Sequence, residues 1–213
     1  VDPLSLSKII YGGDAEGYVG FKSSHQGVRY LSSFAVKRNF AHEFQKIDRI
    51  NVNAVESIKI LRQRFQNVGA FQTRNIPHFG HQKIMERLLE FCDHLVINPV
   101  IGPKKSGDVT IECLSAVFGE FFKHKFGGRI SFIPFFANMY YAGPREAIHH
   151  TILRHNLGFS HFTVGRDHAG ADGFFDPNLA PKLVSSLKQD LDIEVFCHFG
   201  ATHCSECQNV IIA

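Results

Sequence analysis

The stretch VGAFQTRNIPHFGH, residues 68–81, joins an apolar segment to a helical one through a polar turn. Val68, Ala70 and Phe71 are typical of a short buried strand, whereas the apolar residues after position 81 recur at helical spacing. The backbone N–H groups and the dipole at a helix N-terminus favour a bound anion. The stretch therefore predicts a phosphate or oxyanion site at the junction of a strand and a helix.

The two histidines of this stretch, His78 and His81, stand three residues apart. On one helical turn this spacing brings both rings to the same side, and Gly80 would let a ligand approach the backbone. A pair of capping or partly buried histidines is the alternative interpretation. Four polar residues of the same turn have little to offer a hydrophobic core and favour the oxyanion site. They are Gln72, Thr73, Arg74 and Asn75.

A second polar cluster, GRDHAG at residues 165–170, follows the apolar run at residues 159–164. In an open parallel sheet, the loops that follow the strands lie on one edge and together form the ligand crevice. The alternative is an ordinary turn in which Asp167 pairs with Arg166. We expect the two polar clusters to meet in one site.

Apolar strands and amphipathic helices alternate from residue 67 onward. The predicted strands cover residues 68–71, 94–100, 130–136, 161–164 and 193–199. The predicted helices cover residues 79–91, 109–125, 144–156 and 179–191. Strict alternation is typical of a parallel sheet with helices on both faces, so the predicted fold class is α/β and Rossmann-like.

The chain divides into three predicted parts. They are a short N-terminal segment at residues 1–66, an α/β domain at residues 67–200 and a cysteine-containing tail at residues 201–213. Glycines at positions 12, 13, 17 and 20 punctuate the start, which predicts a β-containing segment there. A helix is predicted over residues 53–65.

The composition is that of a soluble globular protein with one good core, since 44% of its 213 residues are hydrophobic and the net charge is +3. Lysines and arginines are scattered, so no nucleic-acid-binding stripe is predicted. No apolar run reaches the roughly 18 residues that span a bilayer, so we expect no membrane segment and a cytoplasmic location. Cys204 and Cys207 have a spacing that favours a metal or redox role, and Cys197, His198 and His203 could complete a tetrahedral zinc shell.

The ordered motifs between residues 68 and 170 resemble those of the ATP sulfurylases, or sulfate adenylyltransferases. The matching blocks are QTRN with the histidine pair (72–81), VIGPKKSGD (100–108), YAGPREA (141–147) and GRDHAG (165–170). HFGH is also similar to the HxGH signature of the wider nucleotidylyltransferase superfamily. The resemblance implies a catalytic Rossmann-like domain that joins sulfate to the α-phosphate of ATP and releases pyrophosphate. Its product would be adenosine 5′-phosphosulfate.

The resemblance also implies roles for the matching residues. Gln72 and Arg74 would hold sulfate, with the backbone N–H of Ala169 as a further donor. Thr73 and Asn75 would contact the phosphates. The reaction then needs positioning and charge neutralisation, and no serine or cysteine nucleophile.

For the leaving group, the resemblance implies that His78 and His81 stabilise the departing pyrophosphate. The nucleotide would be bound by Gly165, Arg166, Asp167 and His168. The loop from Lys104 to Asp108 could close over bound ATP, and a solvated turn is its alternative interpretation. Mg²⁺ would arrive with ATP, coordinated mainly by phosphate oxygens and water.

The chain departs from the family pattern in three places: Ile76 precedes the proline, Tyr140 replaces an arginine, and Ala171-Asp172 replaces Pro-Gly. Gly80 and Tyr140 leave a second interpretation open, a nucleotidylyltransferase for a different oxyanion or phosphorylated acceptor. The short part before the first motif leaves a third one open, a catalytically incomplete nucleotide-binding homologue. The resemblance further implies a structural zinc at the cysteine pair of the tail and a homo-oligomer.

Overall fold

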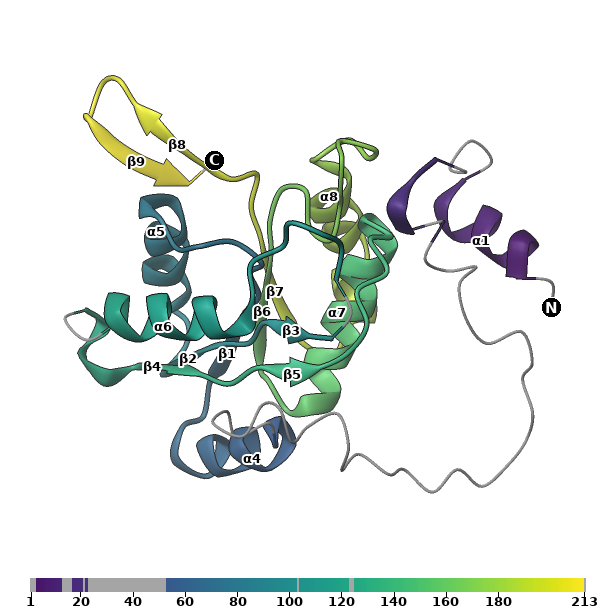
Figure 1. Ribbon diagram of the computed structural model, residues 1–213. Coiled ribbons are helices and arrows are strands. Elements are labelled where there is room, and N and C mark those ends of the chain that lie inside the picture. Colours follow the sequence, from purple (N-terminus) through teal and green to yellow (C-terminus); the bar gives the residue numbers. More distant parts are fainter. Residues whose placement is uncertain are drawn as a thin grey trace.

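The computed structural model describes residues 3–12, 17–20, 22, 53–102, 104–122 and 125–212. Its centre is a five-stranded sheet in the order β4-β2-β1-β6-β7, with every pairing parallel (Figure 1). The strands are β1 (Val68–Phe71), β2 (His94–Ile97), β4 (Ile130–Phe132), β6 (His161–Val164) and β7 (Glu194–Cys197). The predicted α/β class with a parallel sheet is confirmed.

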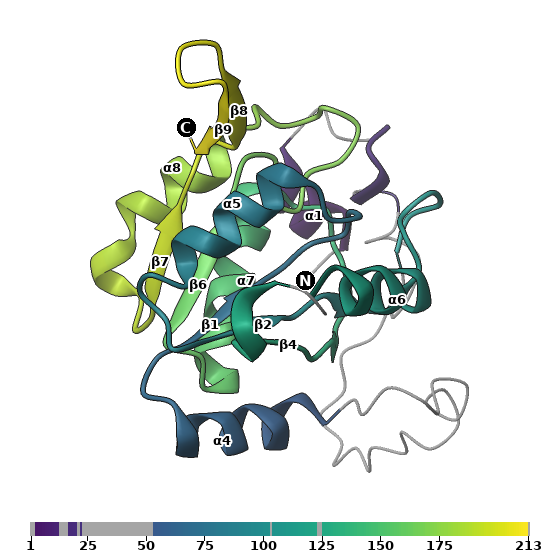
Figure 2. The same ribbon diagram turned by 90° about the vertical axis from the view of Figure 1, so that its left-hand side faces the viewer.

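Helices cover both faces of the sheet (Figures 1 and 2). One face carries α5 (Phe79–Leu88) and α6 (Ile111–Phe122). The other carries α4 (Ala54–Arg64), α7 (Pro144–Leu157) and α8 (Leu179–Ser186).

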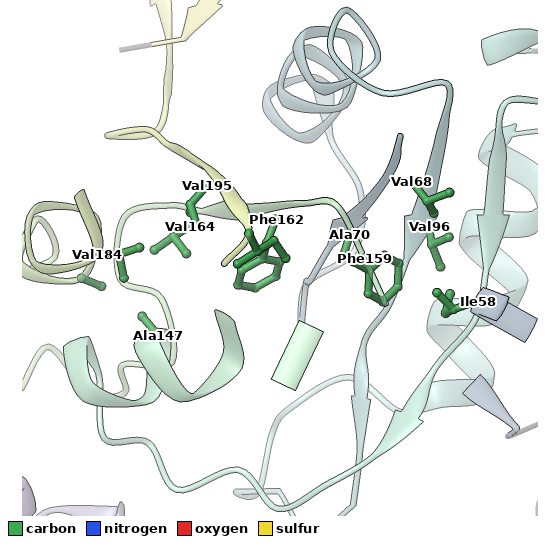
Figure 3. Packing of buried hydrophobic residues seen from close by; sticks show 12 residues of the cluster. Ile58, Val68, Ala70, Val96, Ala147, Phe159, Phe162, Val164, Val184 and Val195 are labelled. Atoms are coloured by element: carbon green, nitrogen blue, oxygen red, sulfur yellow. The ribbon is translucent and has the colours of Figure 1, made fainter. Parts of the chain in front are cut away.

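Side chains of each strand alternate between the two faces. In β1, Val68 and Ala70 enter the core beneath α4, α7 and α8, whereas Phe71 enters the core beneath α5 and α6. Figure 3 shows the first of these cores, in which Phe159 and Phe162 lie among the smaller side chains. Because both faces are covered, the strands are continuous apolar runs, which is why the sequence locates them well.

Two predicted strands are each divided in two. Residues 94–100 form β2 and then β3 (Val100–Ile101), and residues 130–136 form β4 and then β5 (Phe135–Phe136). A proline, Pro99 or Pro134, stands in each break and has no N–H for the ladder. β3 and β5 pair in parallel as a small second sheet.

The shorter elements complete the described chain. Two 3-10 turns, η2 (Phe126–Gly128) and η3 (Lys188–Asp190), precede β4 and follow α8. The tail is an antiparallel hairpin of β8 (Ala201–Cys204) and β9 (Asn209–Ile212), which contacts α5. Of the helices in the described part of the chain, none has the length and apolar character that crossing a bilayer requires.

The start of the chain corrects one prediction. Residues 3–11 form the helix α1 (Pro3–Tyr11), so the predicted β-containing start is wrong for this segment. Gly12 follows with φ +98° and donates its N–H to the Lys8 carbonyl at 2.9 Å, which makes it a helix stop. The hydroxyl of Tyr11 donates to the Tyr140 carbonyl at 2.7 Å and thus fastens α1 beside the start of α7. Most of the predicted N-terminal segment, residues 23–52, lies outside the described residues.

Candidate active site

A cavity of about 130 Å³ opens at the carboxyl ends of β1 and β6. These two strands are neighbours in the sheet, and the chain continues from β1 toward β2 and from β6 toward β7, in opposite directions. Such a topological switch point is the usual ligand crevice of an open α/β sheet. Residues 72–75 and 165–169 line the cavity together with His81 and His198. The two predicted clusters therefore meet in one place.

Arg74 connects the loops around this cavity. Its Nη2 donates to the carbonyl of Gly170 at 2.8 Å, and its Nη1 lies 3.6 Å from Oδ2 of Asp108. The guanidinium carbon also lies 5.6 Å from the centre of the Tyr141 ring. A guanidinium has five N–H donors, so Arg74 keeps donors for a bound anion while it holds the loops in place.

In the rest of the first cluster, Gln72 and Asn75 face the cavity, whereas Thr73 stabilises the turn. Oε1 of Gln72 is buried and has no hydrogen-bond partner in the described part of the chain. Because the oxygen and nitrogen of an amide are assigned from their partners, this side chain can equally turn its NH₂ to an oxyanion. The hydroxyl of Thr73 accepts from the Asn75 N–H at 3.0 Å and donates to the Asn75 carbonyl at 3.2 Å, so it shapes the turn. Asn75 itself is exposed at the cavity.

The rings of His78 and His81 lie on the same side of α5, as predicted, with centroids 4.0 Å apart. Nδ1 of His78 accepts from the Gly80 N–H at 3.1 Å, so His78 caps the helix and does not line the cavity. Burial, then the neighbouring His78 and His198, lower the pKa of His81 to about 4. His81 is thus a neutral ring at the cavity wall, and its buried Nδ1 has no hydrogen-bond partner among the residues that the structure describes.

Two residues with left-handed backbone shape the second cluster, Asp167 at φ +53° and Ala169 at φ +54°. Such residues are uncommon outside glycine and gather at functional sites. Gly170 leaves room for the Asp167 carboxylate, because a Cβ there would lie 2.1 Å from Oδ1 of Asp167 and would displace this side chain. Within the described residues the N–H of Ala169 donates no hydrogen bond, so it is available at the cavity wall.

His198 is a site residue that the sequence assigns to zinc instead. It follows β7, and its Nδ1 accepts from the Gly200 N–H at 3.2 Å. Burial lowers its pKa to about 4. Its ring lies against Gly165, where a Cβ would come within 2.5 Å of Cε1 of His198. Gly165 therefore makes room for this ring. A polar residue near the carboxyl end of the strand predicted over residues 193–199 is the signal that could have placed His198 here.

The loop of Lys104 and Asp108 lies beside the cavity and is fastened by Tyr141. The Tyr141 hydroxyl accepts from the Lys105 N–H at 2.6 Å and donates to Oδ2 of Asp108 at 3.1 Å. Nζ of Lys105 also lies 3.3 Å from Oδ1 of Asp172. Lys104, whose pKa is lowered by burial, lines a second cavity of about 350 Å³ together with Asp108.

Comparison with known proteins shows the family of the chain. The family model described as ATP-sulfurylase matches residues 53–212, which include both clusters and the whole sheet. The chain belongs to the ATP-sulfurylase family. The resemblance of the motifs is thereby confirmed.

Three relatives named sulfate adenylyltransferase illustrate the ATP-sulfurylase similarity. The protein of Pyrococcus abyssi is 37% identical over 165 residues, which cover 76% of this chain and 43% of that protein. That of Hyperthermus butylicus is 40% identical over 148 residues, 69% of this chain and 38% of the relative. That of Cenarchaeum symbiosum is 35% identical over 212 residues, 97% of this chain and 55% of the relative. The chain thus spans about half the length of the curated relatives it matches.

Among solved structures, a chain titled "Hexameric APS kinase from Thiobacillus denitrificans" has a similar fold. The TM-score is 0.55 at 13% sequence identity, and the match covers 74% of this chain and 29% of that one. At this identity the likeness concerns the fold alone.

The tail of this ATP-sulfurylase family member presents its cysteine pair on a hairpin. Cys204 ends β8 and Cys207 lies in the turn before β9. Backbone N–H groups of the turn lower the pKa of the Cys204 thiol, which favours a thiolate, and two thiolates fit one half of a tetrahedral zinc site. Within the described residues no three histidine, cysteine or acidic side chains gather as a metal site. The prediction that Cys197, His198 and His203 complete the zinc shell is therefore wrong for this part of the chain.

The departures from the ATP-sulfurylase pattern lie near the loops of the site. Tyr140, which stands in place of an arginine, is 43% exposed. Asp172, in place of a glycine, adopts φ +54° and pairs with Lys105 of the neighbouring loop. Ile76 is 48% exposed in the turn before His78. The residue at 172 therefore gives this chain an ion pair that a glycine does not offer.

Proposed function

We propose that the chain catalyses adenylyl transfer from ATP to sulfate. A sulfate oxygen would attack the α-phosphorus of ATP in line with the bond to the β-phosphate, and that bond would break to give adenosine 5′-phosphosulfate and pyrophosphate. The names of the relatives support this reaction. The observation that carries the proposal is the single cavity in which residues 72–75 meet residues 165–169.

Both reactants are anions, so the site must hold them together and neutralise their charge. Sulfate would be bound by the Arg74 guanidinium, the Gln72 amide and the Ala169 N–H. Oε1 of Gln72, which is buried and has no partner within the described ranges, supports this assignment. A planar guanidinium suits a tetrahedral oxyanion through paired hydrogen bonds. The cavity is well below the roughly 300 Å³ at which sites for drug-sized ligands begin. It would therefore hold the oxyanion and only the part of the nucleotide that adjoins the reacting phosphate.

The histidine pair would act on the leaving group. A nearby anion favours the protonated form of histidine, so pyrophosphate would raise the pKa of His81 from about 4 and draw a proton to it. His78, with its ring 4.0 Å from that of His81, would share this anion at the N-terminus of α5. Asn75 would contact the phosphates from the turn that Thr73 shapes.

On the nucleotide side, Arg166, Asp167 and His168 would supply the contacts, and Gly165 the space for the His198 ring. Among the described residues that line the cavity, Asp167 is the only carboxylate, which is too few for a protein-held magnesium site. Mg²⁺ would therefore enter with ATP, held by phosphate oxygens and water, and would add positive charge at the phosphates. The residues present fit a metal that arrives with its nucleotide.

The test is ATP formation from adenosine 5′-phosphosulfate and pyrophosphate, followed with luciferase. Arg74→Lys and His81→Asn should each lower the rate by about 100-fold or more, because each removes a group that stabilises developing charge. His149→Asn, a change at an exposed position of α7, is the matched control and should retain the wild-type rate.

Two other results would contradict the proposed reaction, and each would indicate a different function. If sulfate fails to release pyrophosphate from ATP while another oxyanion or a phosphorylated acceptor does so, the acceptor is different. If the folded protein binds ATP and turns over with no acceptor of such a panel, the chain is a nucleotide-binding homologue without this activity.

A further inference from the structure

Three polar residues follow one another at four-residue intervals on α7, namely Glu146, His150 and Arg154. Glu146 is 2% exposed and the other two are fully buried. This spacing places them on one face of the helix. The face meets the loop of residues 165–170, because Nδ1 of His150 lies 3.1 Å from Nε2 of His168. The row therefore leads from a buried carboxylate to a residue of the cavity wall.

Backbone groups hold Glu146 as a carboxylate. The N–H of Tyr140 donates to its Oε1 and the N–H of Ala142 to its Oε2, each at 2.9 Å. Burial raises the pKa of Glu146, and these two bonds oppose that rise. One donor for each oxygen favours the ionised form, which can only accept hydrogen bonds.

The carboxylate decides which ring nitrogen of His150 carries the proton. Nε2 of His150 lies 3.3 Å from Oε1 of Glu146, although the pair is not aligned as a full hydrogen bond. Such contacts often tighten when a ligand binds. A proton on Nε2 is attracted by the carboxylate, so Nδ1 keeps its lone pair. This lone pair then accepts the Nε2–H of His168.

Arg154 keeps a second proton off His150. Its guanidinium carbon lies 4.3 Å from the ring centre of Phe135 and 5.0 Å from that of Phe162, and its Nη2 donates to the Asn98 carbonyl at 2.9 Å. Burial and this cation lower the pKa of His150 well below its ordinary value. His150 is therefore neutral, so only one of its two ring nitrogens carries a proton.

We propose that Glu146 and His150 are positioning residues that fix the tautomer of His168, with its proton on Nε2 and the lone pair of Nδ1 available to a ligand. Nε2 of His168 is engaged by His150, so Nδ1 is the ring nitrogen left for the cavity that His168 lines. An acceptor in that place disfavours phosphate oxygens and suits a hydroxyl group. Resting on the proposed function, the ligand is a ribonucleotide, and the hydroxyl belongs to its ribose.

The tautomer can be measured directly by ¹⁵N NMR of the histidine rings, with the His168 signals assigned from their loss in His168→Gln. In the wild-type protein, Nε2 of His168 should be protonated and Nδ1 should not. The opposite tautomer would overturn the proposal without any variant of α7. Because this measurement needs no turnover, it is independent of the proposed reaction.

Variants of His150 test the relay itself. His150→Phe removes the acceptor, and His168 should then lose its preference for the Nε2 proton. His150→Asn keeps an acceptor oxygen near the place of Nδ1 and should preserve the wild-type tautomer. His149→Phe, at the exposed neighbouring position, is the matched control. Wild-type His168 signals in folded His150→Phe would refute the relay.

The ligand is tested by binding ATP, 2′-deoxy-ATP and 3′-deoxy-ATP to the wild type and to His150→Phe. Loss of the hydroxyl that meets Nδ1 should weaken wild-type binding about 2- to 10-fold, as one neutral hydrogen bond does. The same analogue should bind His150→Phe as well as ATP does. Equal binding of all three nucleotides to the wild type would refute the hydrogen bond between a ribose hydroxyl and Nδ1 of His168. Failure of sulfate-dependent turnover alone would refute only the proposed reaction.

Discussion

Replacing Asp108 by asparagine should strengthen the binding of sulfate, although it removes an ion pair from the protein. The carboxylate of Asp108 has 9% of its side chain exposed and lies 3.6 Å from Nη1 of Arg74. The same guanidinium is the group proposed to bind sulfate, so the two anions compete for it. Asparagine has nearly the same size and keeps an oxygen for the Tyr141 hydroxyl, which donates to Asp108 at 3.1 Å. The substitution therefore removes charge and little else.

The size of the effect follows from the separation. At 3.6 Å and an effective dielectric constant of about 20, the bare attraction between Arg74 and Asp108 is roughly 4 to 5 kcal/mol. Desolvation of both groups offsets most of it, and pairs close to the surface contribute up to about 1 kcal/mol net. Since a factor of ten in affinity corresponds to about 1.4 kcal/mol, the dissociation constant of sulfate should fall about 3- to 5-fold.

The assay is calorimetric titration with sulfate at one ionic strength, set with chloride, because exposed charges are screened by salt. Asp172→Asn is the matched control, since it removes the partner of Lys105, a carboxylate that is 59% exposed and pairs at 3.3 Å. Asp172→Asn should change the dissociation constant of sulfate by no more than about 2-fold. Weaker sulfate binding by Asp108→Asn, or equal changes in the two variants, would show that Asp108 does not compete for Arg74.

Three further predictions concern stability. Because the folded pKa of His198 is about 4 and its ordinary value is 6.5, the unfolded chain takes up the proton first, so stability should fall as the pH drops from about 6.5 to 4. In His198→Asn, the decrease in the free energy of unfolding over this pH range should be smaller by up to about 3 kcal/mol, measured by urea unfolding at several pH values. Gly165→Ala should destabilise by about 1–3 kcal/mol, since its Cβ would meet the His198 ring at 2.5 Å. Gly119→Ala, inside α6 with open space around it, should stabilise by about 0.5–1 kcal/mol in the same urea assay.

The sheet could be predicted from the sequence because its strands are buried on both faces. β1 and β6 have the predicted bounds, and α7 extends one residue beyond its predicted end, to the residue before Gly158. Gly158 takes φ +95° and closes that helix, as a glycine at this place should. The predicted β-containing start is wrong because glycines end helices as well as marking turns between strands. Gly12 ends the helix α1.

The two polar clusters of the site could be predicted for a related reason. Each follows directly after an apolar strand, and parallel strands bring such loops to the same edge. His198 follows β7 at the same edge, but its proximity in sequence to the cysteines favoured a zinc interpretation. Sequence order indicates which residues follow a strand; it does not tell whether a ring turns toward the cavity or toward the tail.

The burial of Glu146, His150 and Arg154 could not be predicted from the hydropathy of the sequence. Charged and polar residues at four-residue spacing are the usual pattern of a solvated helix face, yet here they are buried. Their burial depends on partners far away in the chain: the Asn98 carbonyl and two phenylalanine rings for Arg154, and His168 for His150. A buried polar row of this kind is stable only when its partners are in place, so it forms together with the cavity wall. That mutual dependence is the physical reason to connect α7 with the chemistry of the site.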